Sequence, residues 1–412
     1  METLSTEYDL WKELLAEEGI NLINYPGKSS KRNYLFFSIL FSIIYIFHAD
    51  IASAESYDKE ELKQIIEGIY NSRCVALVSG DPSNLKQFYD VLQKQGQWAL
   101  EHEVKRVKYL KYWSSERGIQ FTNIQSAVRI KKIYPIENRL RMSLEESYKF
   151  DYIYPYDEEP STNSFGVGIR HTVELVKKDD KYIINKDWYT DCFEDALSGL
   201  SGNATNNTFH NSEENLSKQN YYALRVIASQ HYNRARAVQY ADKYCGAAWG
   251  SGNDYKYNKT YVDYNGIGGD CTNFASQVIG DKEGGGLKQD GTWRYNYSKF
   301  GNGSGSTAWA NADGLKEYLL YSGKGAIIKR GNFKELTAPA PEYPNGMVSR
   351  LQVGDLICYA KKEDIDHFAV VTGFDSQGYP LVNSHTTDRY HVPWDLGWGD
   401  TKINFYLIHM RD

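Results

Sequence analysis

Residues 268–277, Gly-Gly-Asp-Cys-Thr-Asn-Phe-Ala-Ser-Gln, restrict the local fold most strongly, because they place a cysteine at the start of a predicted helix. The two glycines permit a tight turn, and Asp270 is a good N-cap residue. Cys271, Ala275 and Val278 recur at helical spacing. The helix dipole is expected to lower the pKa of the Cys271 thiol, and the first backbone N–H groups are suited to hold an oxyanion. The alternative is a small buried cysteine that begins an ordinary core helix.

A histidine that is suited to serve this cysteine as a base lies near the C-terminus. Residues 366–373, Asp-His-Phe-Ala-Val-Val-Thr-Gly, are typical of a strand that begins at His367. A further strand is predicted over residues 380–385, where Asn383 and His385 are two positions apart and share a face. Either of them is expected to meet His367 across the strand pair. The alternative for a histidine at a strand edge is a hydrogen-bonded structural residue.

These two motifs, together with Val-Gly-Asp-Leu-Ile at residues 353–357 and Leu-Val-Asn-Ser-His-Thr-Thr-Asp-Arg at residues 381–389, resemble the amidase domain family of Gram-positive bacteria. That family is similar to the papain-like cysteine hydrolases of the CHAP and NlpC/P60 type. The resemblance covers residues 220–412, with all four motifs in order. It implies an α+β domain in which the cysteine heads a helix that packs on an antiparallel sheet.

The resemblance also implies the roles of the site residues. Cys271 is the expected nucleophile, His367 the base and Asn383 the third member, with His385 as the alternative third member. The implied enzyme is a cysteine amidase or endopeptidase that hydrolyses an amide or peptide bond in cell-wall peptidoglycan. A transferase, in which an amine resolves the acyl-enzyme, would use the same residues. A second class of function stays open, a catalytically silent cell-surface module for binding or assembly.

Two aromatic residues, Trp293 and Tyr295, lie between glycine-rich loops and are expected at the rim of a substrate groove. Together with Asp270 they are the predicted substrate-binding residues, although Asp270 is most simply a helix cap. A metal site is a weaker alternative, because residues 385–391 contain two histidines and an aspartate but match no standard zinc motif. No metal and no other cofactor is therefore predicted. Asp388 is expected to tie the loop after the third strand.

The N-terminal segment predicts export. Basic residues precede an apolar run at residues 34–47, and Ala-Ser-Ala follows at residues 52–54. This pattern indicates a signal peptide with an extended N-terminus over residues 1–54, cleaved after Ala54, and hence a secreted or cell-wall protein without a stable membrane span. An uncleaved signal anchor is the alternative.

Residues 55–197 predict a separate α+β domain, because helical patterns come first and a long antiparallel meander follows. This order resembles NTF2-like domains, which form a curved α+β cone. No catalytic constellation is evident, and His171 and Asp187 are expected to be surface or satisfied groups. The domain is expected to bind the wall, a protein partner or the other domain. The expected helices are 59–70, 85–95 and one around 98–110, and the expected strands are 122–134, 140–154, 166–178 and 182–191.

Residues 198–219 are rich in Ser, Gly, Asn and Thr, which predicts a flexible linker that lets the two domains move independently. Beyond it, helices are expected at 221–244 and 309–321, and further strands at 353–359 and 404–410.

Charge and cysteine content restrict the class of protein. The net charge of −6 is spread along the chain and gives no indication of nucleic-acid binding. The five cysteines, Cys74, Cys192, Cys245, Cys271 and Cys358, leave at least one thiol unpaired, and we expect all five to be reduced.

Overall fold

The computed structural model describes residues 58–199, 231–298, 303–398 and 403–411. The predicted signal peptide and nearly all of the predicted linker lie outside these residues and stay predictions. No helix within the described ranges is long and apolar enough to cross a membrane. The expected α+β class is confirmed, with antiparallel strands throughout the main sheet.

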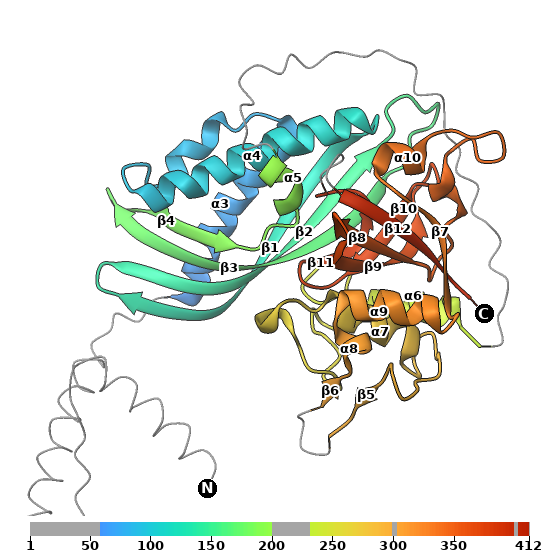
Figure 1. The fold of residues 1–412 in the computed structure, drawn as a ribbon. Coiled ribbons are helices and arrows are strands. Elements are labelled where there is room, and N and C mark those ends of the chain that lie inside the picture. The colour runs from blue at the N-terminus through green and yellow to red at the C-terminus, as the bar shows by residue number, and fades with distance from the viewer. Residues whose placement is uncertain (1–57, 200–230, 299–302, 399–402, 412) are drawn as a thin grey trace, which may run out of the picture. The chain divides into compact units, whose positions relative to one another are not determined.

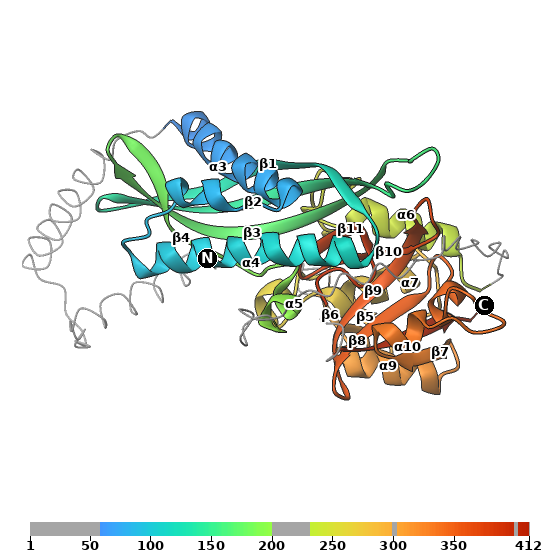
Figure 2. The same ribbon diagram turned by 90° about the horizontal axis from the view of Figure 1, so that it is seen from above.

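The N-terminal half consists of two long helices on a meander of antiparallel strands. Figures 1 and 2 show α3 and α4 running across one face of the strands β1 to β4. Asp58 caps the first helix by accepting a hydrogen bond from the backbone N–H of Glu60, and Gly80 ends it with a φ of +70°. The elements are α3 (Lys59–Ser79), η1 (Ser83–Phe88), α4 (Lys94–Glu116), β1 (Gln120–Ile136), β2 (Arg139–Ile153), β3 (Asn163–Lys178), β4 (Lys181–Tyr189) and α5 (Glu194–Gly199).

The predicted strands of this half are confirmed, and one predicted helix is wrong. Residues 85–95 do not form a continuous helix, because the chain extends at Tyr89 and forms a bridge with Ile184 of β4. The backbone N–H of Asp90 then donates to the carbonyl of Ile184 at 2.8 Å. Pairing with a strand therefore overrides the local helical pattern, and the second long helix starts only at Lys94.

The C-terminal half is a six-stranded part of the same sheet with helices on both faces. The strands run in the order β11-β10-β9-β8-β12-β7. The elements are α6 (Arg234–Tyr244), η2 (Asn265–Ile267), α7 (Cys271–Gly280), β5 (Tyr295–Asn296), β6 (Ser304–Gly305), α8 (Thr307–Ala310), α9 (Ala312–Tyr321), β7 (Gly325–Gly331), α10 (Phe333–Thr337), η3 (Met347–Arg350), β8 (Leu356–Lys361), β9 (Asp364–Phe374), β10 (Pro380–Ser384), β11 (Asp388–Pro393) and β12 (Ile403–Met410).

Two apolar cores lie on opposite faces of these strands. The first core packs α6, α7, α8 and α9 against side chains such as Phe368 and Val370 of β9. The second core joins α10 and the segment around Trp394 to the alternate side chains, such as Ala369 and Val371. Because successive side chains of a strand point to opposite faces, membership in a core shows which face a residue occupies.

The predicted C-terminal elements are confirmed in place, with corrections at their ends. A helix was expected over residues 221–244. Within the described residues it begins only at Arg234, where the side chain of Asn233 caps it. The hydroxyl of the buried Tyr232, just before this start, donates to the carbonyl of Gly354 at 2.7 Å. The helix expected at 309–321 is divided at Asn311, whose side chain caps α9.

Strand β3 of the N-terminal half pairs directly with β11 of the C-terminal half. Two glycines on β3 permit residues 247–249 to pack closely on this strand, since a Cβ atom at Gly166 would lie 2.1 Å from the carbonyl oxygen of Trp249 and one at Gly168 would lie 2.4 Å from the carbonyl carbon of Ala247. The paired backbones contradict the expectation that the two halves move independently. The exact domain boundaries stay predictions.

Candidate active site

Cys271 is the first residue of α7, as predicted, and its side chain is buried, with 8% of the residue exposed. Burial is the largest influence on its thiol and raises the pKa, while a backbone hydrogen bond from Phe368 and the hydroxyl of Thr272 lower it only in part. The expectation that the helix start lowers this pKa is therefore wrong, because the effect of burial is larger. All five cysteines of the chain are free and buried.

Asp270 directly precedes Cys271, and its side chain does not cap the helix. One carboxylate oxygen accepts from the backbone N–H of Tyr264 at 3.0 Å and from the side-chain amide of Asn273 at 2.8 Å. The other oxygen lies 2.6 Å from Nδ1 of His385. With 1% of the residue exposed, Asp270 is a buried partner of His385, which contradicts the prediction that it contacts substrate.

His385 follows β10 and lies between two aromatic rings. The ring of Tyr257 covers one face and the ring of Phe274 the other, each with its centroid 3.8 Å away. Nε2 of His385 lies 2.7 Å from the carbonyl oxygen of Tyr244, and Nδ1 faces the Asp270 carboxylate. Both ring nitrogens of His385 thus lie within hydrogen-bond distance of an oxygen atom, which fixes the orientation of the ring.

His367 is not brought together with Cys271. The centroid of its ring lies 5.5 Å from that of Tyr359 and 5.2 Å from that of Trp398. Tyr359 belongs to the second core. Phe368, the next residue, points to the core that contains α7. Because successive side chains of β9 point to opposite faces, His367 shares the face of Ala369 and Val371, opposite the face that carries α7.

The environment of His367 is apolar, and its Nε2 atom has no hydrogen-bond partner. Burial and the nearby charge of Arg389 lower the pKa of His367 to about 3. The histidine is therefore neutral in the folded protein at neutral pH, whereas it takes up a proton below pH about 6.5 in the unfolded chain. Between these two pH values the unfolded chain binds one more proton at this histidine than the folded protein does, so the stability of the fold falls as the pH decreases.

Replacing His367 with methionine is expected to make the folded protein less sensitive to acid. In the wild type the stability falls as pH decreases from about 6.5 toward 3, with a slope of about 1.4 kcal/mol per pH unit from this single group. The variant lacks this contribution, so urea unfolding curves measured at several pH values should show a shallower fall. Equal slopes for the two proteins would contradict the buried, neutral state of His367.

Asn383 lies on the face that carries α6 and α7, as does His385, but it makes no contact with His367. Its carbonyl oxygen accepts from the hydroxyl of Thr372 at 2.7 Å and from the backbone N–H of His391 at 2.8 Å. Its amide donates to Asp242 at 2.9 Å, and Asp242 also lies 2.9 Å from Nε2 of His391. These bonds hold β10 and β11 together, which is a structural role.

The three residues weighed as a metal site bind separate partners. His385 bonds to Asp270, and His391 bonds to Asp242. Asp388, which is fully buried, accepts a bond from Arg170 at 2.9 Å. Each of the three residues thus has a different partner in the structure.

Trp293 and Tyr295, the predicted rim of a substrate groove, are buried members of the first core. The indole N–H of Trp293 donates to the hydroxyl of Ser276 at 3.0 Å. The hydroxyl of Tyr295 accepts from the backbone N–H of Val262 at 2.9 Å. The rim prediction is therefore wrong, because Trp293 binds α7, Tyr295 binds the backbone at Val262, and both side chains are buried.

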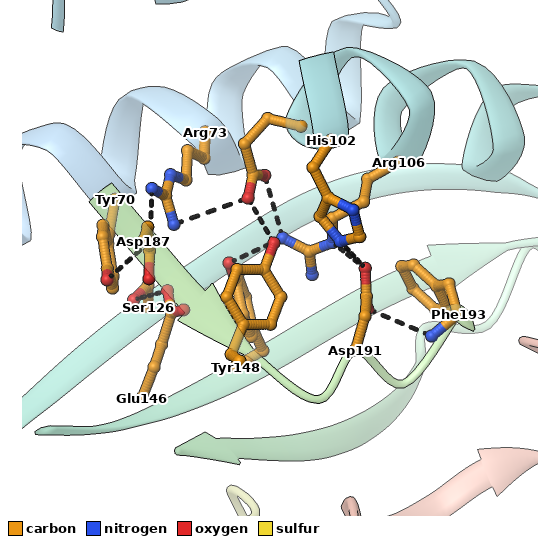
Figure 3. Close-up of polar contacts among 12 residues, drawn as sticks. Tyr70, Arg73, His102, Arg106, Ser126, Glu146, Tyr148, Asp187, Asp191 and Phe193 are labelled. Carbon is orange, nitrogen blue, oxygen red and sulfur yellow. Dashed lines mark hydrogen bonds and ion pairs between the residues drawn. The ribbon is translucent and has the colours of Figure 1, made fainter. Parts of the chain in front are cut away.

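A second polar cluster, which the sequence did not predict, lies between α3, α4 and the sheet of the N-terminal half (Figure 3). His171 lies 3.1 Å from Glu146 and 2.9 Å from Asp187, and Arg73 lies 2.7 Å from Asp187. Burial alone would lower the pKa of His171, but the neighbouring carboxylates raise it to about 9. His171 and Asp187, expected to be surface or satisfied groups, are satisfied and buried.

The cluster continues along α4 as a row of alternating charges. Glu103 lies 3.5 Å from Arg73 and 3.0 Å from Arg106, and Asp191 lies 3.1 Å from Arg106 and 2.8 Å from His102. The helical spacing could have indicated that Glu103 and Arg106 are buried, because both lie on the face of α4 that also carries its buried apolar residues. They differ from ordinary core residues only in being charged.

Residues 231–408, less than half of the chain, match the model of a protein family described as "Putative amidase domain". The matched region contains Cys271, His367, Asn383 and His385. The match indicates amide-bond chemistry for the C-terminal half. No curated protein matches the chain.

The similar solved structures cover about a third of the chain. They include the intermembrane space region of the chloroplast protein ARC6 (TM-score 0.23, 9% identity, 32% of this chain and 96% of that chain). Another is the Kfla4162 protein from Kribbella flavida (TM-score 0.22, 9% identity, 32% and 92%). A third is a protein from Campylobacter jejuni described as a "Putative NTF2-like transpeptidase" (TM-score 0.16, 14% identity, 31% and 98%). An NTF2-like protein is thus among these neighbours, at TM-scores too low to carry a further argument.

Proposed function

We propose that the C-terminal half is a cysteine-dependent amidase or peptidase with Cys271 as its nucleophile. The observation that carries the proposal is the ion pair between Asp270 and His385, which adjoins Cys271 at the start of α7. An activated nucleophile needs a histidine that a third group orients, and the contact between Asp270 and His385 supplies that orientation beside the helix that Cys271 begins. The match of residues 231–408 to the amidase family supports the same chemistry.

His385 is the histidine that the geometry favours. It shares with Cys271 the face that carries α7, because its ring stacks on Phe274 of that helix. His367, the base implied by the family resemblance, lies on the other face of β9. The Asp270 carboxylate would orient His385, and Asn383 would hold the strand from which His385 extends.

The reaction starts when His385 takes the proton of the Cys271 thiol at Nε2, which leaves a thiolate and an imidazolium. The sulfur attacks the amide carbonyl, and backbone N–H groups at the start of α7 receive the oxyanion. The C–N bond breaks as His385 gives its Nε2 proton to the leaving amine. Neutral His385 then takes a proton from water, whose oxygen displaces the sulfur. Nε2 must first leave the carbonyl of Tyr244.

The proposed substrate is a peptide of the bacterial cell wall. Support comes from the predicted signal peptide over residues 1–54, which would deliver the enzyme to the cell surface. An amine in place of water would turn the same steps into an acyl transfer.

The second candidate function is a silent surface module that has kept the fold without turnover. One observation favours it, the burial of the Cys271 thiol with its raised pKa. A buried thiol of high pKa is a poor nucleophile until the site opens. The two functions differ in whether any covalent bond of the substrate is cut.

Incubating the full chain with Gram-positive peptidoglycan, followed by mass spectrometry of the released fragments, separates these functions. We expect fragments with a new carboxyl end and a new amino end, and their masses identify which amide bond is cleaved. His385→Gln should abolish their release, whereas His367→Gln should retain it in a protein with an unchanged melting temperature. Loss of release in His367→Gln alone would reverse the choice of histidine, and no release by the wild type would favour the silent module.

A further inference from the structure

We propose that Arg170, on strand β3 of the N-terminal half, is a positioning residue for the candidate active site of the C-terminal half. This inference rests on the proposed function, because it assigns Arg170 to holding His385. It means that the amidase-like region depends on a part of the chain that the family match leaves out.

The link begins at the buried carboxylate of Asp388 on β11. Nη2 of Arg170 donates to Oδ2 of Asp388 at 2.9 Å, and the backbone N–H of Ala247 donates to the same oxygen at 2.6 Å. The other oxygen, Oδ1, accepts from the hydroxyl of Tyr257. A fully buried carboxylate needs such partners, and Arg170 is the cation among them.

Tyr257 carries the link from Asp388 to the histidine. Its ring stacks on His385 at 3.8 Å with an interplanar angle of 15°, and its hydroxyl also accepts from the side-chain amide of Asn265 at 2.9 Å. The guanidinium of Arg170 lies 5.1 Å from the centre of the same ring. Asp388 thus fixes the hydroxyl of Tyr257 by a hydrogen bond, and the Tyr257 ring covers one face of the His385 ring.

The backbone around this link is packed too closely to adjust. Gly246 has a φ of +72°, and a Cβ atom there would lie 2.2 Å from the Tyr257 ring and 2.4 Å from the Asp388 carboxylate. The carbonyl of Ala247 accepts hydrogen bonds from two residues of the N-terminal half, Ser147 and Arg129. The N-terminal half therefore also holds the backbone at Ala247, directly after Gly246.

Removing the charge of Arg170 would leave Asp388 buried without its cation. The Asp388 carboxylate would then keep only its hydrogen bonds from Tyr257 and Ala247, or would bind water in place of Arg170. Either change would displace the Tyr257 ring that stacks on His385. A small displacement of a catalytic group lowers the rate more than it lowers substrate binding. An effect on kcat with little change in KM separates this role from a role in substrate binding.

The test uses the full chain labelled with 15N-histidine and three variants, Arg170→Met, Arg170→Lys and the control Arg141→Met. Arg141 lies on the adjacent strand β2 and pairs with Glu174 at 2.8 Å, away from Asp388. The ring N–H signals of His385, assigned with His385→Gln, report its position without any substrate. We expect Arg170→Met to shift or broaden them and to lower kcat by up to about 100-fold, Arg170→Lys to restore part of both, and Arg141→Met to change neither.

Unchanged His385 signals in a folded Arg170→Met protein would overturn the inference. Shifted signals in a protein whose wild type cleaves nothing would uphold the positioning role and reject the proposed function. If Arg170→Met does not fold, Tyr257→Phe replaces it, since this change keeps the ring and removes only its bond to Asp388. Signals identical to the wild type in that variant would also overturn the inference.

Discussion

Replacing Arg106 with methionine is expected to destabilise the protein by about 3–5 kcal/mol, because it breaks a buried ion-pair row by removing one partner. The guanidinium has no exposed surface and lies 3.0 Å from Glu103 and 3.1 Å from Asp191. Methionine fills much of the space of the aliphatic stem, so the loss comes mainly from the charge and its hydrogen bonds.

The carboxylates that remain explain the size of the effect. Glu103 would keep only Arg73 at 3.5 Å as its cation, and Asp191 would keep only His102 at 2.8 Å. The pKa of Asp191 is lowered to about 2 in the folded protein because Arg106 and His102 outweigh the effect of burial. Without Arg106 this carboxylate loses its strongest stabilising charge while it stays out of water.

Urea unfolding of the wild type and of Arg106→Met at neutral pH measures this difference. Lys63→Met serves as the matched control, because Lys63 also lies on a helix of this half but forms exposed pairs at 3.6 and 4.0 Å. We expect the control to change the stability by less than about 1 kcal/mol. An equally small effect of Arg106→Met would contradict the view that this row holds α4 on the sheet.

Replacing Cys271 with alanine is expected to lower amide cleavage by more than about a thousand-fold, because it removes the group that forms the covalent bond. Serine should not restore the rate, since its hydroxyl is far less acidic than a thiol and both ring nitrogens of His385 already contact Asp270 and the carbonyl of Tyr244. The remaining activity would report what backbone donors alone contribute.

Cys358→Ala is the control for this experiment. Cys358 is a fully buried cysteine on β8 in the same apolar core as α7, so both changes remove one thiol from one region. We expect Cys358→Ala to keep most of the activity and to lose some stability through the cavity. Similar losses of activity in both variants would indicate a packing effect and would contradict the nucleophilic role of Cys271.

Much of the fold followed from local patterns in the sequence. The four strands of the N-terminal half were predicted because their apolar residues and turns mark each end, as at the Asp179-Asp180 turn, where both residues have positive φ. The wrong predictions arose where residues far apart in the sequence pair with one another. Tyr89 joined β4 by a bridge, and β11 was missed because Asp388 and Arg389 are charged residues whose partners come from distant segments.

The contacts of the predicted site residues differ from those that local spacing suggested. Cys271 lies at the start of its helix as expected, while His367 lies with Ala369 and Val371 on the face of β9 opposite α7. The pairing of Asp270 with His385 depends on a contact between residues 115 positions apart, which local spacing does not encode. The buried charges of α4 were hidden for the same reason, since each needs a partner from another element.

The most direct test of the proposed mechanism is to detect an acyl group on Cys271 during turnover. The full chain would be mixed with a cell-wall peptide, quenched in acid within seconds, digested and analysed by mass spectrometry, beside Cys271→Ala and Cys358→Ala. We predict a mass increase equal to the acyl half of the substrate on the peptide that contains Cys271, in the wild type and in Cys358→Ala only. Undiminished product release by Cys271→Ala, with no adduct on the wild type, would contradict the nucleophilic role of Cys271.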